Sequence, residues 1–232
     1  MNRLAVFVEG YTEVMFVERL IEEIAGNHRV LIEHREIRGG GATTRTMGLV
    51  KAANPDTGQK YFALIVDCGG DEQVKSRILE EHQNLTAKGY LKIIGIRDVR
   101  PKFTHSDIPR LEANLPKYVK TSLIPVQFIL SIMEIEAWFL AETTHYQKID
   151  PSITVEAIKA ALGFDPETDD IEQLATPAND LNNCYAIGGK TYLKHKAKDT
   201  VVALDYTLIY MELYTKFRYL QRLIASIDAF LN

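Results

Sequence analysis

Acidic residues follow four short apolar runs of the sequence, at the points where those runs end. They are Glu9 and Glu13 after residues 4–8, Asp67 and Asp71 after residues 61–66, Asp98 after residues 91–96, and Glu134 and Glu136 after residues 126–132. If the runs are parallel strands, these carboxylates meet at one edge of a sheet, where open α/β sheets bind ligands. Clustered carboxylates repel one another unless cations lie between them, and hard oxygen ligands favour Mg²⁺ or Mn²⁺ over zinc. The pattern predicts a Mg²⁺ or Mn²⁺ site, and two such ions would suit the attacking and leaving oxygens of a phosphodiester.

Each acid has a plainer interpretation when it is taken alone. Glu13 suits the positive end of a helix dipole, and Asp67 begins a turn rich in Gly and Asp. Glu136 is a candidate salt-bridge partner, and Trp138 is expected in the core rather than beside a ligand. Competing signatures are missing, because Gly10 lacks the following glycines of a dinucleotide fingerprint and no Gly-Lys-Ser/Thr phosphate loop occurs. The coincidence of the acids at one predicted edge therefore favours the metal site.

Strand-like and helix-like segments alternate over the first part of the chain. Continuous apolar runs are typical of strands buried on both faces of a parallel sheet. Strands are expected at residues 4–8, 30–37, 61–66, 91–96 and 126–132, and helices after residue 12 and at residues 72–87. Thr12 is the expected N-cap of the first helix, and Gly26 ends it. This alternation predicts an α/β fold, with a mostly parallel sheet flanked by helices.

The pattern changes after about residue 148. Short helices are expected at residues 152–162 and 171–174, and two amphipathic stretches lie within residues 200–231. No strand pattern of comparable strength occurs there. We therefore expect an α/β domain over residues 1–148 and a helical C-terminal subdomain over residues 149–232.

The composition narrows the class of protein. The 232 residues are 46% hydrophobic and 25% charged, which is typical of a globular protein, and the net charge is −4. That charge excludes a nucleic-acid binder that works by bulk positive charge alone, although a local basic patch is compatible with it. Cys68 and Cys184 are too few for a disulfide framework or a four-ligand zinc site and suit a reducing compartment. No apolar run is long enough for a secretory signal or a membrane span, so the expected location is the cytoplasm.

Two motifs carry a resemblance to a known family. Residues 7–13 read Phe-Val-Glu-Gly-Tyr-Thr-Glu and resemble the opening motif of the Toprim fold, in the form found in the overcoming-lysogenization-defect (OLD) nucleases. Residues 134–138 read Glu-Ile-Glu-Ala-Trp. Together the two motifs resemble those of the bacterial Toprim-like DUF4276 family. The resemblance covers residues 1–145 well and the remainder weakly.

The resemblance implies roles for the acids. Glu9 matches the Toprim glutamate, a metal ligand that is also credited with acid–base work, and Glu13 matches the second acid of the OLD-like motif. Asp67 matches the first aspartate of the Toprim Asp-x-Asp motif, but here the chain reads Asp67-Cys-Gly-Gly-Asp71. Three alternatives follow from this departure: Asp71 reaches a metal across the extra residues, Asp98 takes over the missing role, or a single ion binds.

The resemblance also implies a later acidic ligand and a catalytic lysine. Glu134 and Glu136 lie at the place of the acidic ligand, and Glu136 is preferred. OLD-like nucleases are thought to use a lysine against transition-state charge, and Lys194 in the basic segment 188–196 is the candidate. A solvated basic loop is the alternative for that segment.

Further basic residues are candidates for binding the phosphates of a substrate. They are Arg38 before the glycines at 39–41, Arg97 and Arg100 on either side of Asp98 and Val99, and Lys190 and Lys196 in the basic segment. The backbone N–H groups of the three glycines could hold a phosphate oxygen.

The leading hypothesis is a metal-dependent phosphodiesterase, a Toprim-type nuclease that cuts DNA or RNA. The resemblance implies a bacterial phage-defence effector, in some cases beside an ATPase partner. The alternative is a catalytically weak or inert Toprim-like subunit that binds a metal, a nucleotide or a protein, and the altered aspartate motif favours it. A small-molecule phosphohydrolase is a third hypothesis. The amphipathic C-terminal helices could pair with a second copy in a homodimer.

Overall fold

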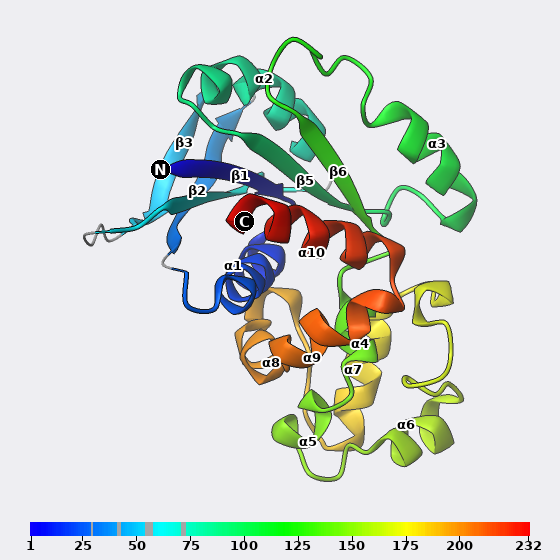
Figure 1. The fold of residues 1–232 in the computed structure, drawn as a ribbon. Coiled ribbons are helices and arrows are strands. Elements are labelled where there is room, and N and C mark those ends of the chain that lie inside the picture. The colour runs from blue at the N-terminus through cyan, green and yellow to red at the C-terminus, as the bar shows by residue number, and fades with distance from the viewer. Residues whose placement is uncertain (29, 41–42, 54–57, 71–72) are drawn as a thin grey trace.

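The computed structural model describes residues 1–28, 30–40, 43–53, 58–70 and 73–232 (Figure 1). Its centre is one sheet with the strand order β3-β2-β4-β1-β5-β6. The strands are β1 (Asn2–Val8), β2 (Val30–Gly40), β3 (Thr43–Lys51), β4 (Tyr61–Asp67), β5 (Lys92–Asp98) and β6 (Val126–Ser131). β1 pairs in parallel with β4 and β5, β2 with β4, and β5 with β6, whereas β2 and β3 are antiparallel. The predicted α/β class and mostly parallel sheet are confirmed.

β1 lies in the middle of the sheet, and its side chains from Leu4 to Val8 are completely buried. Because it has a strand on each side and helices over both faces, its apolar residues form a continuous run instead of alternating with polar ones. The strands predicted from the continuous runs are therefore found, with small shifts at their ends. β3, which the sequence did not predict, is an exposed strand at the edge of the sheet.

Helices cover both faces of the sheet and extend beyond it. They are α1 (Tyr11–Ala25), α2 (Gln73–Ala87), α3 (Ile108–Asn114), α4 (Glu136–Ala141), α5 (His145–Ile149), α6 (Val155–Leu162), α7 (Pro177–Ile187), α8 (Lys198–Ala203), α9 (Tyr206–Met211) and α10 (Arg218–Leu231). The chain passes from β1 through α1 to one side of the strand order, and from β4 through α2 to the other. Crossovers of the same hand in opposite directions put α1 and α2 on opposite faces, as Figure 1 shows.

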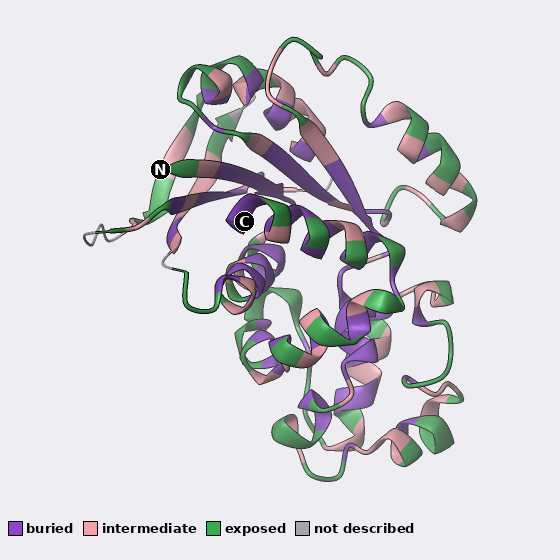
Figure 2. Cartoon of the chain, in the orientation of Figure 1, coloured by how far each residue is buried: buried purple, intermediate pink, exposed green. Residues whose placement is uncertain are grey.

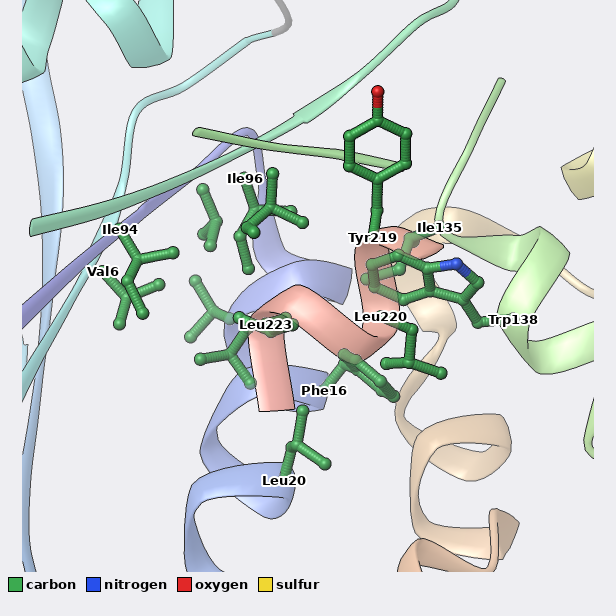
Figure 3. Packing of buried hydrophobic residues seen from close by; sticks show 14 of the residues in the cluster. Val6, Phe16, Leu20, Ile94, Ile96, Ile135, Trp138, Tyr219, Leu220 and Leu223 are labelled. Carbon is green, nitrogen blue, oxygen red and sulfur yellow. The ribbon is translucent and has the colours of Figure 1, made fainter. Parts of the chain in front are cut away.

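The helices from α4 to α9 form a group beside α1, and α10 returns from them to pack on β6 and α1 (Figure 1). Buried residues continue from the sheet into this group (Figure 2). Trp138 of α4 is completely buried, as expected, with its ring centre 5.9 Å from that of Phe16 in α1. Leu220 of α10 packs in the same region (Figure 3). One hydrophobic core thus includes residues on both sides of residue 148, and the predicted domain boundary stays a prediction.

Some local predictions are corrected by the structure. α1 begins at Tyr11 with Gly10 at its N-cap position, so Thr12 is not the cap. Gly26 does end this helix, with a φ of 51° that favours glycine. α7 was not predicted. None of the described helices combines the length and the apolar composition that a membrane crossing requires.

Candidate functional site

The predicted acids are brought to one edge of the sheet by strand pairing. Val8 at the end of β1 is in register with Asp67 at the end of β4, and Asp98 at the end of β5 is in register with Ser131 at the end of β6. The connection after β1 leads to β2, on one side of the strand order, and the connection after β4 leads to β5, on the other side. Glu9 therefore lies at the point of the sheet where the two connections diverge. Ligands of open α/β sheets bind at such a point.

Glu9 and Glu13 occupy the loop after β1 and the first turn of α1, and both side chains are buried. Oε1 of Glu9 accepts a hydrogen bond from the backbone N of Asp98 at 3.2 Å, which joins the ends of β1 and β5. Burial, and then the carboxylate of Glu136, raises the pKa of Glu13 to about 7. Glu13 can therefore gain or lose a proton close to neutral pH.

Asp98 is a buried carboxylate at the end of β5. The hydroxyl of Ser131, on the neighbouring strand β6, donates a hydrogen bond to its Oδ1. Burial and the nearby Glu13 raise the pKa of Asp98 well above its ordinary value. These two carboxyl groups are thus close enough for the charge of one to oppose the ionisation of the other.

Glu136, at the start of α4, is completely buried, and burial raises its pKa. The hydroxyl of Tyr192 donates a hydrogen bond of 2.6 Å to its Oε1, while its Oε2 has no hydrogen-bond partner among the described residues. Glu134 instead accepts a hydrogen bond from the backbone N of Ala178, in the first turn of α7. We call Glu9, Glu13, Asp98, Glu134 and Glu136 the acidic cluster.

Lys194, the residue predicted as a catalytic lysine, lies against the acidic cluster. Its Nζ is 3.2 Å from Glu134 Oε1, 3.5 Å from Glu136 Oε2 and 3.6 Å from Asp98 Oδ2. The hydroxyl of Thr12 donates a hydrogen bond to the backbone oxygen of Lys194 at 2.9 Å and so fixes the segment against α1. Burial lowers the pKa of Lys194, but the carboxylates of Glu136, Asp98 and Glu134 outweigh it and raise that pKa above its usual range. Lys194 therefore remains positively charged.

A cavity of about 260 Å³ opens onto these groups. Its lining residues are Glu9, Gly10, Tyr11, Thr12, Glu13, Asp98, Lys194 and His195. Acids from two strand ends and one helix therefore meet an ammonium group at a surface that a ligand can reach.

Asp67 lies beside this cluster, and Asp71 lies outside the described residues. Oδ1 of Asp67 accepts a hydrogen bond from the backbone N of Gly69 at 2.8 Å. Burial, and then Glu36 on β2, raises the pKa of Asp67, and its own charge contributes to the raised pKa of Glu13. Asp67 is therefore close enough to interact with the acidic cluster.

Two of the predicted phosphate-binding residues line a second cavity. This cavity, which we call the lysine cavity, measures about 570 Å³ and is lined by Lys148, Lys190 and Lys196 together with Tyr185, Tyr192 and Asp199, among others. Lys190 forms an ion pair of 3.6 Å with Asp150. Because Tyr192 also contacts Glu136, the lysine cavity adjoins the acidic cluster.

The predicted arginines are engaged with other parts of the chain. Arg38 is exposed and binds Glu36 on its own strand, at 3.0 Å. Arg100 donates a hydrogen bond to the backbone oxygen of Ala175 at 3.1 Å. Arg97 packs against Phe103 on the other face of β5 from Asp98, because successive side chains of a strand point to opposite faces. In the part of the chain that the structure describes, none of the three forms an ion pair with the acidic cluster.

Sequence reasoning missed three residues that support the site. Each donates a hydrogen bond from its hydroxyl group: Thr12 to the backbone oxygen of Lys194, Ser131 to Asp98, and Tyr192 to Glu136. Thr12 lies within the first motif, and Tyr192 precedes Lys194 by two residues, so both were near a recognised signal. For Ser131 the sequence gave only a weak signal, namely a polar residue at the end of an apolar strand.

The chemistry of the donors fits the predicted Mg²⁺ or Mn²⁺, because the cluster offers carboxylate oxygens alone and leaves Glu136 Oε2 without a hydrogen bond. As the side chains lie, no group of three or more His, Cys, Asp or Glu residues within the described ranges could hold an ion. The Lys194 ammonium instead meets three of the carboxylates. Metal binding at this site therefore requires side chains to turn, with Glu9, Glu13, Asp67, Asp98 and Glu136 as the available ligands.

Comparison of the chain with protein-family models, with curated proteins and with solved structures gives no match. The resemblance to Toprim and DUF4276 proteins accordingly rests on the two sequence motifs.

Proposed function

We propose that this protein is a Mg²⁺- or Mn²⁺-dependent phosphodiesterase that cuts DNA or RNA at the acidic cluster. The observation that carries the proposal is the convergence of buried carboxylates from separate strand ends on a charged lysine beside an open cavity. One ammonium group cannot balance the acidic cluster when all five carboxyl groups are ionised, and a divalent cation is then the natural counter-ion for the remainder. The two motifs that resemble OLD-type Toprim nucleases support the same activity.

The residues of the cluster suit different parts of such a reaction. A bound metal ion would supply Lewis-acid polarisation of the phosphoryl oxygen. Lys194, whose positive charge is secured by its acidic neighbours, would stabilise the negative charge that develops on the phosphoryl group. Glu9 is the proposed acid–base residue of the Toprim motif, and Glu13, whose pKa is raised to about 7 in the metal-free protein, would ionise and serve as a ligand when a cation binds.

The lysine cavity offers a path for the rest of a nucleic-acid chain. Lys190 and Lys196 place positive charge beside the acidic cluster, although the protein as a whole carries a charge of −4. Local charge of this kind is what a phosphate backbone recognises. We include these two lysines in the proposal as phosphate-binding residues.

The cellular context of the proposal rests on the resemblance and the composition. It comprises a bacterial defence role, an ATPase partner, a homodimer and a cytoplasmic location. Cys68 and Cys184 are both buried free thiols, as a reducing compartment would allow.

A second candidate function is a Toprim-like subunit that binds a ligand without cutting nucleic acid. The position of the Lys194 ammonium favours it, because an amine that already meets three carboxylates competes with a metal ion for them. The replacement of Asp-x-Asp by Asp67-Cys-Gly-Gly-Asp71 points in the same direction.

Cleavage of plasmid DNA, single-stranded DNA and RNA with Mg²⁺ or Mn²⁺ distinguishes the two functions. The wild type should cut at least one substrate, and Glu9→Gln should lose at least about a hundredfold in rate, the scale on which a preorganised electrostatic group contributes to catalysis. Glu156→Gln, a change of the same kind at an exposed position of α6, should cut like the wild type.

The other outcomes are equally informative. Cutting that survives in Glu9→Gln would contradict the assigned site and indicate a contaminating nuclease. If neither protein cuts, calorimetric titration with Mn²⁺ decides the case. Binding by the wild type that is lost in Glu9→Gln would support the non-catalytic subunit.

A further inference from the structure

A second basic hollow lies on the face of the sheet opposite Lys194. This hollow, the α2–α3 pocket, measures about 310 Å³ and is lined by Lys75 of α2, Arg97 of β5, Phe103, and Arg110, Leu111, Asn114 and Leu115 of the α3 region. Its described lining residues include three cations and no acid. Because Arg97 and Asp98 are consecutive on β5, the pocket and the acidic cluster are on opposite faces of the same strand end.

Two guanidinium groups of the pocket share one aromatic ring. The Cζ atoms of Arg97 and Arg110 lie 5.2 Å and 5.6 Å from the centre of the Phe103 ring. Arg110 also forms an ion pair of 2.8 Å with Asp107. Nε of Arg97 is buried and has no hydrogen-bond partner among the residues that the structure describes. A buried charged donor without a protein partner is costly, so an acceptor that reaches this atom would be favoured.

Lys75 adds a third positive charge at close range. Its Nζ donates a hydrogen bond to the backbone oxygen of Asn114 at 2.7 Å, which draws α2 and α3 together. Burial, followed by the positive charges of Lys117 and Arg97, lowers its pKa. Lys75 and Arg97 therefore repel each other, and a bound anion would relieve that repulsion.

We propose that the α2–α3 pocket binds a phosphate group. Two arginines with planar arrays of donors and a neighbouring ammonium suit the tetrahedral oxygens of a phosphate. The phosphate could belong to a nucleic-acid chain or to a free nucleotide, since both present the same group. The inference does not rest on the proposed hydrolysis, because it uses other residues and requires no metal ion.

Binding measured in EDTA tests this inference apart from any cleavage. A fluorescein-labelled single-stranded DNA oligonucleotide is titrated with the wild type and with the variants Lys75→Gln and Arg110→Gln, and calorimetry repeats the series with adenosine monophosphate. Each variant should weaken binding about five- to tenfold, as expected for the loss of an exposed hydrogen bond to a charged group. Lys120→Gln, which removes the charge of an exposed lysine outside the pocket, should change affinity less than about twofold.

The results separate the sources of the phosphate. Tight binding of the oligonucleotide that millimolar adenosine monophosphate does not displace assigns the pocket to nucleic acid, and ready displacement assigns it to a nucleotide. Binding of neither probe overturns the inference. So does equal affinity of the wild type and both pocket variants, or an equal loss in Lys120→Gln, because bulk charge would then account for the binding. Circular dichroism verifies that each variant is folded.

Discussion

Lys194 supplies positive charge to a group of acids that would otherwise repel one another. Its ammonium lies within 3.6 Å of Asp98, Glu134 and Glu136, and two of these carboxylates have raised pKa values. The same ammonium would face substrate in the proposed reaction. Stability and the proposed activity would therefore depend on the same side chain.

Replacing Lys194 by Met should destabilise the metal-free protein. We expect a loss of roughly 1–2 kcal/mol at pH 8, less than the 3–5 kcal/mol that follows the breaking of a fully buried ion pair, because the Lys194 side chain is 45% exposed. Thermal unfolding in EDTA measures the loss. Saturating Mn²⁺ should restore part of it, since a metal ion can replace the ammonium as counter-ion, and the absence of any recovery would contradict metal binding at the cluster.

Glu13 should make stability depend on pH. Burial, with Glu136 nearby, raises its pKa from 4.5 to about 7, so the folded protein holds a proton that the unfolded chain releases. The resulting stabilisation is complete below about pH 4.5 and is lost as the pH rises through about 7. Glu13→Gln stays neutral and should gain roughly 1–3 kcal/mol over the wild type between pH 5 and pH 8. Urea unfolding in EDTA at both pH values measures this, and a constant difference would show that Glu13 ionises normally.

At the scale of elements, the sequence predicted the buried strands and the convergence of acids at their ends. β1, β4, β5 and β6 have continuous apolar runs because neighbours cover them, and parallel pairing then fixes where the following acids lie. β3 escaped prediction because it is exposed along most of its length and shows no apolar pattern.

α7 escaped prediction for a different reason. It begins at Pro177 and contains four asparagines or aspartates before Cys184, among them Asn182 and Asn183, so its composition resembles that of a loop. Tertiary contacts offset this weak propensity: Ala178 donates to Glu134, and the side chain of Asn182 accepts from the backbone N of Tyr192. α7, which the sequence pattern did not predict, therefore positions Glu134 of the acidic cluster and Tyr192, which precedes Lys194 by two residues.

The packing of α2 on β5 depends on Gly95. A Cβ at this position would lie 2.5 Å from Cδ1 of Ile78 and 3.1 Å from both Val74 and Phe128, in a region where Ile78 is completely buried. Gly95→Ala should therefore cost roughly 1–3 kcal/mol of stability, the usual range for overpacking, as measured by urea unfolding. Ile78→Val removes the clashing methyl group, so the double variant should be more stable than the sum of the single changes predicts. Strict additivity would contradict this packing.

At the scale of the whole molecule, the site unites residues that lie far apart in the sequence. The acids of the cluster follow strands, so their position could be predicted from the order and pairing of those strands. Lys194 instead belongs to a short 3₁₀ turn within a helical region without strands. Spacing alone gave no reason to bring Lys194 to the sheet, and its role was predicted only through the family resemblance. The sequence could name candidate metal ligands but not the arrangement of their side chains, because that arrangement depends on side-chain torsions that a sequence does not specify.

Because the core runs across residue 148, the chain should unfold as one unit. Trp138 is the single tryptophan; its ring packs against Phe16 of α1, and Leu220 of α10 lies in the same region, although α1 and α10 come from opposite ends of the chain (Figure 3). Its fluorescence and the far-UV circular dichroism should therefore change at the same urea concentration. Leu220→Ala in α10 should lower both midpoints together, with a cost of about 2–5 kcal/mol for the deleted buried side chain. A circular dichroism curve with two steps, of which only one shifts in the variant, would show instead that residues 1–148 and 149–232 fold independently.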